Sequence, residues 1–239
     1  MSYHFGLERD ELENRLGGGL PKGALVVVEG EYGSGKSVLF ERILYGLLRN
    51  RVRCTFVSTE LTTLHFIEQM YSLDYPVEEY VLDLRLLFLP VYPILGHRGS
   101  KNDLISRLLG AKRMYEQDVI VIDTYSSLVR NWVRAASRDP DVDVAAGIDE
   151  TLYLFKLLTT RGKTVVLGLE PGELDEELVS RLRATADVYL TTKIENSGGA
   201  VTRSLFVRRF ERAESNVADI VPFRVEPKTG FIVEIKSVS

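Results

Sequence analysis

Residues 24–37 read Ala-Leu-Val-Val-Val-Glu-Gly-Glu-Tyr-Gly-Ser-Gly-Lys-Ser, and this stretch decides the fold. Its first part, residues 24–29, is a short apolar run rich in valine, which is typical of a buried parallel strand. Its second part, residues 30–37, matches the pattern G-x-x-x-x-G-K-[ST], and residues 37–51 have the apolar pattern of a packed helix. A strand, a glycine-rich loop and a helix in this order predict a phosphate-binding loop, here called the P-loop.

The residue types of the P-loop suit a phosphate chain. Glycines allow backbone conformations in which several N–H groups point at one anion, and the start of the helix adds its positive dipole end. Lys36 is expected to contact the β- and γ-phosphates, and the Ser37 hydroxyl is expected to ligate Mg²⁺. An ordinary glycine turn is the disfavoured alternative, because strand and helix flank the motif. The predicted nucleotide-binding residues of the loop are Gly30, Gly33, Ser34, Gly35, Lys36, Ser37 and Val38.

Asp123 is the second candidate for the same site. It follows the apolar run 119–122, where a carboxylate of this class of protein holds Mg²⁺ through water. The alternative is an aspartate that caps the turn starting at Thr124. The upstream P-loop favours the metal role.

Glu60 follows a predicted strand at residues 52–58. A carboxylate at that strand end would face the γ-phosphate and could orient or deprotonate an attacking water. Equally, it could be an acidic residue at the start of the next helix, with Thr62 or Thr63 as the cap. The hydroxyls around Glu60 could accept a phosphoryl group or cap that helix, and the second role is favoured; they are Ser58, Thr59, Thr62 and Thr63.

Strand-like and helix-like patterns alternate along most of the chain. Strands are predicted at 24–29, 52–58, 119–122, 164–169 and 188–191, and helices at 37–51, 62–72, 102–116, 148–160 and 173–184. From Asp187 onward, strand patterns are joined by hairpin signals at 196–199 and 227–230. The sequence therefore predicts one α/β domain over residues 1–239, a mainly parallel sheet flanked by helices with antiparallel strands at the C-terminus.

Composition excludes several classes of protein. The 239 residues carry 30 Lys and Arg against 34 Asp and Glu, a net charge of −4, so no nucleic-acid partner is expected. Cys54 is the only cysteine, and residues 1–6 lack signal-peptide features, which favours a cytosolic protein. The most hydrophobic stretch, residues 80–95, contains charged residues and prolines and is not expected to span a membrane. Scarce Asn, Gln, Cys and Met indicate a thermophile, although a GC-rich genome would equally raise the arginine content.

Further motifs carry a resemblance to a known family. Residues 16–23, LGGGLPKG, lead into the P-loop strand, and Val-Ile-Asp-Thr at 121–124 ends a later strand. In both segments the chain resembles the KaiC branch of the RecA-like ATPases, a resemblance that covers nearly the whole chain. Within that branch, residues 58–63 (STELTT) and 66–70 (FIEQM) are similar to the accessory ATP-binding proteins of the archaellum, the archaeal flagellum, known as the FlaH family.

The resemblance implies a RecA-like P-loop NTPase core that binds ATP and Mg²⁺. It implies a cytoplasmic component of the archaellum base, peripheral to the membrane and touching it only through partners. The partners implied are copies of the chain in a homo-oligomeric, hexameric ring, the motor ATPase FlaI and other archaellum base proteins. It also implies slow or absent hydrolysis. The alternatives are a KaiC-like ATPase or autokinase with genuine turnover, and a RecA-like DNA-binding ATPase, which the acidic charge disfavours.

Carried over by residue, Gly33, Gly35, Lys36, Ser37 and Asp123 match the family's nucleotide motif, and Glu60 matches its catalytic glutamate.

The sequence departs from the KaiC pattern at two places. KaiC carries Lys-x-Arg on a late strand that reaches the γ-phosphate of the neighbouring subunit, whereas residues 207–212 here read VRRFER. Arg209 or Arg212 could act as this trans arginine, with a different spacing. KaiC also typically carries two carboxylates at the end of its second strand, and here Thr59 replaces the first of them. Both departures favour weak turnover.

Two further segments are candidates for partner contacts. Arg130, Arg134 and Arg138 are spaced four apart and line one face of a predicted helix. They could form a basic stripe for an acidic partner or anionic lipid. A solvated helix face is the favoured interpretation. Residues 70–95 are rich in Tyr and Leu, and one exposed aromatic there would be a candidate anchor for a partner. The three histidines share no metal-ligand spacing and are His4, His65 and His97.

Overall fold

The computed structural model describes residues 1–91, 108, 110–136, 144–197 and 200–234. The predicted strand and helix around the P-loop are strand β3 (Leu25–Gly30) and helix α2 (Lys36–Arg49). Every residue of β3 is buried, because the strand pairs in parallel with a neighbour on each side and is covered on both faces. The predicted mainly parallel α/β fold is confirmed.

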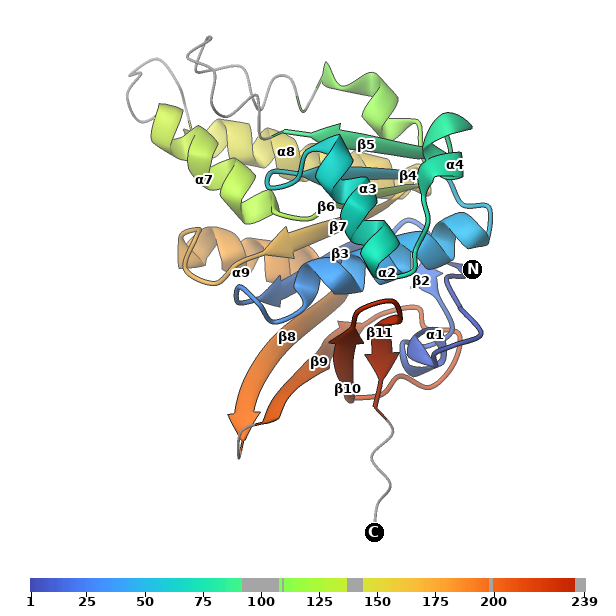
Figure 1. The fold of residues 1–239 in the computed structure, drawn as a ribbon. Coiled ribbons are helices and arrows are strands. Elements are labelled where there is room, and N and C mark those ends of the chain that lie inside the picture. Colours follow the sequence, from blue (N-terminus) through green and yellow to red (C-terminus); the bar gives the residue numbers. More distant parts are fainter. Residues whose placement is uncertain (92–107, 109, 137–143, 198–199, 235–239) are drawn as a thin grey trace.

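The described residues form a sheet of nine strands with the order β11-β10-β9-β8-β3-β7-β6-β4-β5 (Figure 1). The parallel strands are β3, β4 (Cys54–Ser58), β5 (Leu86–Pro90), β6 (Val119–Ile122), β7 (Thr164–Leu169) and β8 (Val188–Ser197). The antiparallel extension consists of β9 (Ala200–Phe210), β10 (Ile220–Glu226) and β11 (Gly230–Val233). The predicted antiparallel C-terminus is thus also confirmed, and β8 extends beyond the predicted strand 188–191.

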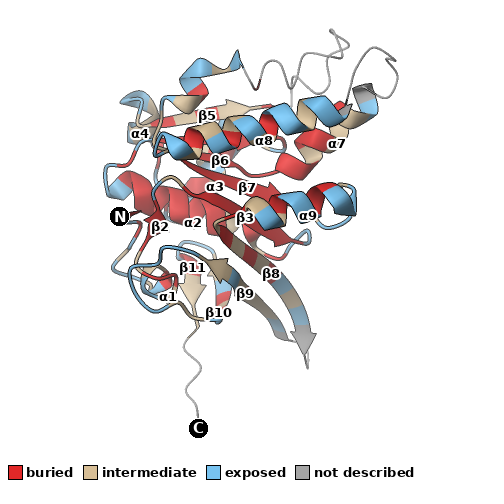
Figure 2. Cartoon of the chain, turned by 180° about the vertical axis from the view of Figure 1, so that it is seen from behind, coloured by how far each residue is buried: buried red, intermediate tan, exposed pale blue. Residues whose placement is uncertain are grey.

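Helices cover the two faces of the sheet as separate layers. One face packs on α2, α3 (Thr63–Ser72) and α4 (Glu78–Leu82), and the other on α7 (Tyr125–Ala136), α8 (Val144–Thr160) and α9 (Glu176–Thr185). Alternate residues of β3 supply the two cores: Val26 and Val28 belong to the first, Leu25 and Val27 to the second. Figure 2 shows the resulting pattern, with buried strands and with outer faces of α8 and α9 exposed.

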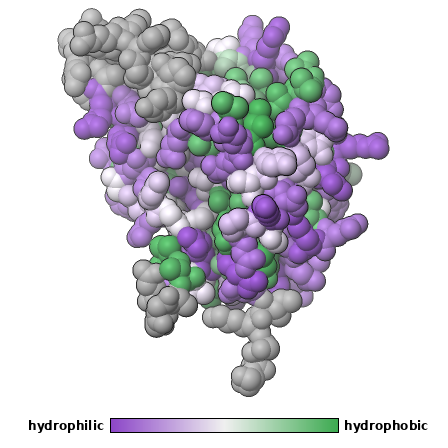
Figure 3. Space-filling view, viewed as in Figure 1, coloured by the Kyte–Doolittle hydropathy of each residue, from purple (hydrophilic) through white to green (hydrophobic). Residues whose placement is uncertain are grey.

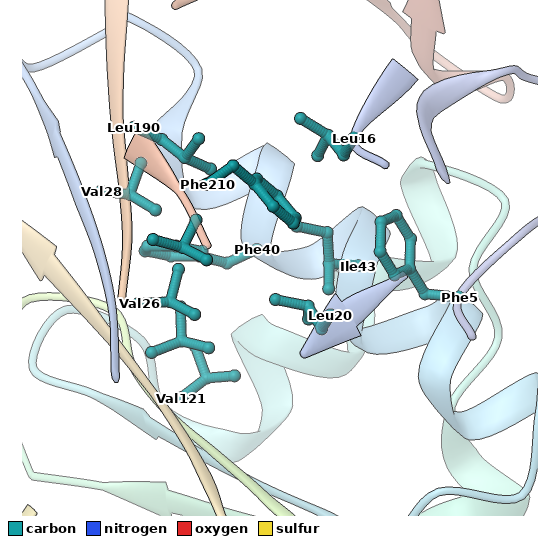
Figure 4. A pocket seen from close by; sticks show the side chains of 12 residues that line it. Phe5, Leu16, Leu20, Val26, Val28, Phe40, Ile43, Val121, Leu190 and Phe210 are labelled. Atoms are coloured by element: carbon teal, nitrogen blue, oxygen red, sulfur yellow. The ribbon is translucent and has the colours of Figure 1, made fainter. Parts of the chain in front are cut away.

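The N-terminal segment packs over the first core. It contains β1 (Ser2–Tyr3), α1 (Leu12–Arg15) and β2 (Leu20–Pro21), and β1 pairs with β2. Apolar side chains from this segment, α2 and the sheet enclose a cavity of about 10 Å³ (Figure 4). Its walls are apolar throughout, so it is a gap in core packing rather than a ligand site.

Several predicted elements differ from the observed ones. Strand β5 lies in the stretch that the sequence analysis treated only as apolar, and it forms the far edge of the sheet. The predicted helix at 102–116 falls mostly outside the described residues, and its last part is the short 3₁₀ helix η1 (Lys112–Tyr115). The hairpin predicted at 227–230 is present between β10 and β11, with Gly230 at φ 76°.

The surface is mainly polar. On the face shown in Figure 3, hydrophobic groups occur in separate patches, and one of them lies over the α4 region, where Leu82 and Leu84 are 83% and 74% exposed. Within the described part of the 70–95 stretch, Tyr71 on α3 is 70% exposed and meets the expectation of an exposed aromatic ring. Among the described residues, none of the helices combines the length and apolar character needed to cross a membrane.

Candidate nucleotide-binding site

The P-loop has the backbone geometry that its glycines permit. Gly33 and Gly35 have φ angles of 79° and 90°, and Gly35 is the N-cap of α2. A Cβ on Gly30 would lie 1.9 Å from the Thr192 hydroxyl, so the close approach of β8 excludes any side chain there. The loop therefore curls tightly from the carboxyl end of β3 into the start of α2, where helix N–H groups are available to an anion.

Ser34 links the P-loop to the neighbouring strand. Its hydroxyl lies 2.7 Å from that of Thr192 on β8, and both side chains are buried. Thr192 was not predicted from the sequence, because it is far from the motif along the chain. Its position in the middle of β8, opposite Gly30 at the carboxyl end of β3, is the signal that would identify it.

The two residues predicted to hold Mg²⁺ lie together. The Ser37 hydroxyl donates to Oδ1 of Asp123 at 3.1 Å, and the Asp123 side chain is buried. Parallel strands bring the P-loop and the end of β6 to the same edge of the sheet, with only β7 between them. A hydroxyl and a carboxylate are oxygen ligands of the kind that Mg²⁺ prefers, so these residues fit the metal.

Burial raises the pKa of Asp123 to about 6. The Lys36 charge and the Ser37 hydrogen bond oppose this rise, while the Glu60 charge adds to it. A bound cation would favour the ionised carboxylate. The side chain of Lys36 is itself buried, with an exposed fraction of 7%, at the first position of α2.

Glu60 lies near the same site, just beyond the end of β4. It is exposed, lies two residues beyond that strand, and its charge acts on Asp123. The cap of α3 is Thr62, whose hydroxyl accepts the His65 N–H at 3.3 Å, so Glu60 precedes the cap and lies outside the first helical turn. Thr59 is hydrogen-bonded to Thr124, and the Ser58 hydroxyl accepts the Glu60 N–H at 3.2 Å. Of the hydroxyl cluster, Thr62 has the predicted capping role, whereas Ser58 and Thr59 form hydrogen bonds outside α3.

Glu41 is an acidic residue near the site that was not predicted from the sequence. It lies in α2, one turn after Ser37, and its side chain is fully buried. Gln69 of α3 donates to Oε1, whereas Oε2 has no hydrogen-bond partner among the described residues. Burial, together with the charge of Asp123, raises the pKa of Glu41 to about 8. A lone glutamate within an apolar helix directly after the P-loop was the available sequence signal.

The loop after β7 is joined to the start of α7. The Ser126 hydroxyl accepts the Glu170 N–H at 2.9 Å and donates to Glu173 at 2.6 Å. Arg130 forms an ion pair with Glu173 at 2.7 Å, so this arginine supports the loop and is not part of an unpaired basic stripe. Arg134 is exposed, and Arg138 lies outside the described residues. Because β7 lies between β3 and β6, Glu170 at its end belongs to the same edge as the P-loop and Asp123.

Both candidate trans arginines donate to carbonyls of their own chain. Nη1 of Arg209 contacts the Arg183 and Ala186 carbonyls at 3.0 and 2.8 Å, at the C-terminus of α9. Arg212 donates to the Lys22 carbonyl at 2.9 Å and pairs with Asp187 at 3.2 Å. Lys22 precedes β3 whereas the P-loop follows it. Arg212 therefore lies at the amino ends of the parallel strands, opposite to the P-loop.

Arg208, directly before the predicted pair, is also exposed. Its Nε donates to the Thr191 hydroxyl at 3.2 Å, and its guanidinium lies 5.0 Å from the centre of the Phe206 ring. With Lys193, it lines an open groove of about 330 Å³ beside Gly30. A contact of any of these arginines with another subunit stays a prediction.

No cluster of metal-ligating side chains is found elsewhere in the described part of the chain. The candidate site therefore consists of the P-loop with Thr192 beneath it, the pair Ser37 and Asp123, and the exposed Glu60 at its rim.

Comparisons with known proteins identify the family of this chain. The family described as ATPase: KaiC matches residues 9–237. The chain is 36% identical to the archaeal flagellar ATP-binding protein FlaH of Methanocaldococcus jannaschii, over 98% of this chain and 96% of that protein. It is 32% identical to FlaH of Methanococcus voltae, over 98% and 97% of the two chains.

Solved structures show the same relationship. The crystal structure of the flagellar accessory protein FlaH from Methanocaldococcus jannaschii superposes with a TM-score of 0.87 at 35% identity, over 98% of this chain and all of that chain. A KaiC-like protein from Pyrococcus horikoshii shares the fold, with a TM-score of 0.73 at 17% identity over 98% and 99% of the two chains. The chain belongs to the KaiC family of ATPases and, within it, to the FlaH proteins.

Proposed function

We propose that this chain is an ATP-binding component of the archaellum motor complex, in which bound ATP sets the conformation of a ring that docks the motor ATPase FlaI. The observation that carries the proposal is the hydrogen bond of 3.1 Å between Ser37 and Asp123 at the start of α2. It joins the two predicted metal ligands beside a P-loop of matching geometry. The names of the FlaH relatives support the placement in the archaellum.

The roles of the residues follow from the site. Gly33, Gly35 and the first turn of α2 offer backbone N–H groups to the phosphates, and Lys36 places its charge on them. Ser37 and Asp123 would hold Mg²⁺, which neutralises charge on the β- and γ-phosphate oxygens when bound. Thr192 keeps Ser34 and the loop against the sheet.

The same residues support slow hydrolysis. Thr59 is a hydroxyl held by Thr124 where the KaiC pattern has a carboxylate, and Arg209 and Arg212 are occupied by backbone carbonyls. A transition state that lacks an arginine contact forfeits several orders of magnitude in rate. We place the protein in the cytoplasm at the archaellum base, reaching the membrane through its partners.

Isothermal titration with MgATP tests the binding site. The wild-type chain is expected to bind, and Lys36→Ala is expected to lose binding because the phosphates lose their main side-chain charge. Lys156→Ala, at an exposed position on α8, is the matched control and should bind as the wild type does. Normal ATP binding by Lys36→Ala would show that the phosphate site is misplaced.

Docking is tested by sedimentation of the chain with purified FlaI. A joint complex is expected with ATP and is expected to be absent without nucleotide and with Lys36→Ala. Equal complex formation in all three mixtures would contradict the nucleotide-dependent role.

The second candidate function is an ATPase or autokinase with genuine turnover. The observation that favours it is the exposed Glu60, whose charge acts on Asp123. Steady hydrolysis above about 1 s⁻¹ without a partner, within the usual range for enzymes, would establish this function and reject the assembly role.

A further inference from the structure

The antiparallel extension of the sheet touches the P-loop from outside the nucleotide motif. Arg203 on β9 and Phe223 on β10 are cross-strand partners. Nε of Arg203 donates to the Gly33 carbonyl at 3.1 Å. Figure 1 places β10 and β11 next to α2, in agreement with the packing of β11 on that helix.

The same pair closes the space under the next glycine. A Cβ on Gly35 would lie 2.7 Å from the Phe223 ring and 3.2 Å from Cδ of Arg203. Phe223 is fully buried and stacks on Phe231 with ring centres 4.4 Å apart, which makes the support under the loop rigid. The P-loop is thus held by an aromatic ring below and a guanidinium at its side.

The Arg203 contact has a consequence for anion binding. A P-loop binds phosphate through N–H groups, so a carbonyl that turned toward the phosphates would repel them. Gly33 has the freedom to make such a turn, because it has no side chain and a φ of 79°. A charge-assisted hydrogen bond from Arg203 holds this carbonyl in one orientation.

We propose that Arg203 is a positioning residue of the nucleotide site, which acts through the Gly33 carbonyl to keep the P-loop in its phosphate-binding shape. The proposal rests on the proposed function that this loop binds ATP. Since Arg203 acts on the loop and not on the γ-phosphate, its loss weakens ATP and ADP binding to the same extent.

The test is isothermal titration of ATP and of ADP, each with Mg²⁺, into the full chain. Arg203→Met removes the donor and keeps the aliphatic stem that packs near Gly35. It is expected to weaken the binding of both nucleotides about tenfold, the scale of a hydrogen bond from a charged group. Arg203→Lys keeps a donor and is expected to fall between Arg203→Met and the wild type.

The matched control is Arg224→Met, next to Phe223 on β10. Arg224 pairs with Glu226 at 2.7 Å and has no contact with the P-loop among the described residues, so its loss is expected to leave both affinities unchanged. Thermal unfolding without nucleotide serves as the measure of folding, and the midpoint of Arg203→Met is expected to stay within a few degrees of the wild type.

Unchanged nucleotide affinity in Arg203→Met, with binding lost in Lys36→Ala, would overturn the inference and leave the proposed function standing. A loss confined to ATP would also overturn it, because it would indicate direct contact with the γ-phosphate. Failure of the wild-type chain to bind either nucleotide would instead reject the proposed function.

Discussion

Glu60 and Glu41 are two carboxylates near one site in opposite environments. Glu60 is exposed at the rim, whereas Glu41 is enclosed between α2 and α3 with one oxygen unpaired. Solvent stabilises the charge of the first and is absent around the second. The two residues are therefore expected to affect different properties of the protein, turnover in one case and stability in the other.

Glu60→Gln is expected to keep ATP binding and to lower the residual hydrolysis rate by a factor of about 10² or more, because the neutral side chain cannot take a proton from water. A coupled phosphate-release assay measures the rate. Glu68→Gln, exposed on α3, is the control and should hydrolyse as the wild type does. An unchanged rate in Glu60→Gln would remove this residue from the chemical step.

Glu41→Gln is expected to change how stability depends on pH. The native pKa of about 8 lies above the ordinary value of 4.5, so the native state holds a proton that the unfolded state releases. The free energy of unfolding therefore falls as the pH rises from 4.5 to 8. The variant removes this contribution and should exceed the wild type by a few kcal/mol above pH 8.

Urea denaturation at several pH values tests the effect of Glu41→Gln. Asp123, whose pKa is raised to about 6, adds a fall in stability in the same direction and stays in the variant, so the pH dependence should flatten without vanishing. Parallel curves for the variant and the wild type would show that Glu41 is ionised in the native state.

At the scale of elements, arginines from β9 hold neighbouring elements in place. Arg209 donates to the last carbonyls of α9, which have no partner within the helix and carry the negative end of its dipole. Arg203 performs a similar task at the P-loop. The strand that extends the sheet thus stabilises a helix end and a loop at different points along its length.

Arg209→Gln is expected to lower the free energy of unfolding by about 1–2 kcal/mol, because the α9 carbonyls lose a charged donor. Chemical denaturation measures the loss, and hydrogen exchange should show earlier opening of α9. Arg208→Gln, at the exposed neighbouring position, should cost less than about 0.5 kcal/mol. An unchanged stability of Arg209→Gln combined with slower hydrolysis in the oligomer would assign Arg209 to the trans site.

At the scale of the whole molecule, a buried ion pair and a hydrogen bond attach the N-terminal segment to α2. Arg42 of α2 donates to Asp10 through Nε and Nη2, at 2.5 and 2.7 Å, and also to the Phe5 carbonyl at 2.9 Å. The exposed fractions of the two charged side chains are 0% and 1%. A buried pair of this kind is costly to break, because one charge is left without a partner and without water.

Asp10→Asn is expected to destabilise the protein by about 3–5 kcal/mol for this reason. Asp74→Asn is the matched control. It removes the partner of Arg9 in an ion pair whose side chains are 29% and 64% exposed, and should cost less than about 1 kcal/mol. Urea denaturation of both variants at pH 7 decides the matter. Equal losses would mean that the buried pair contributes no more than the exposed one.

The sequence by itself determined the P-loop, the parallel α/β class and Asp123. Glycines in positive φ, the start of α2 and a buried valine-rich strand are local properties, written within residues 24–37, and Asp123 follows directly from the end of its own strand. Residue types and short spacings are sufficient for such features, because the backbone conformation depends on near neighbours.

Only the tertiary structure decided which side chains meet the loop from elsewhere. Thr192 contacts Ser34, and Arg203 donates to the Gly33 carbonyl. Arg209 donates to carbonyls at the end of α9, although the sequence predicted Arg209 and Arg212 equally as trans arginines. The burial of Glu41 is likewise set by α3 packing over α2. Such contacts depend on strand order and on the packing of segments far apart in the chain, which no local pattern encodes.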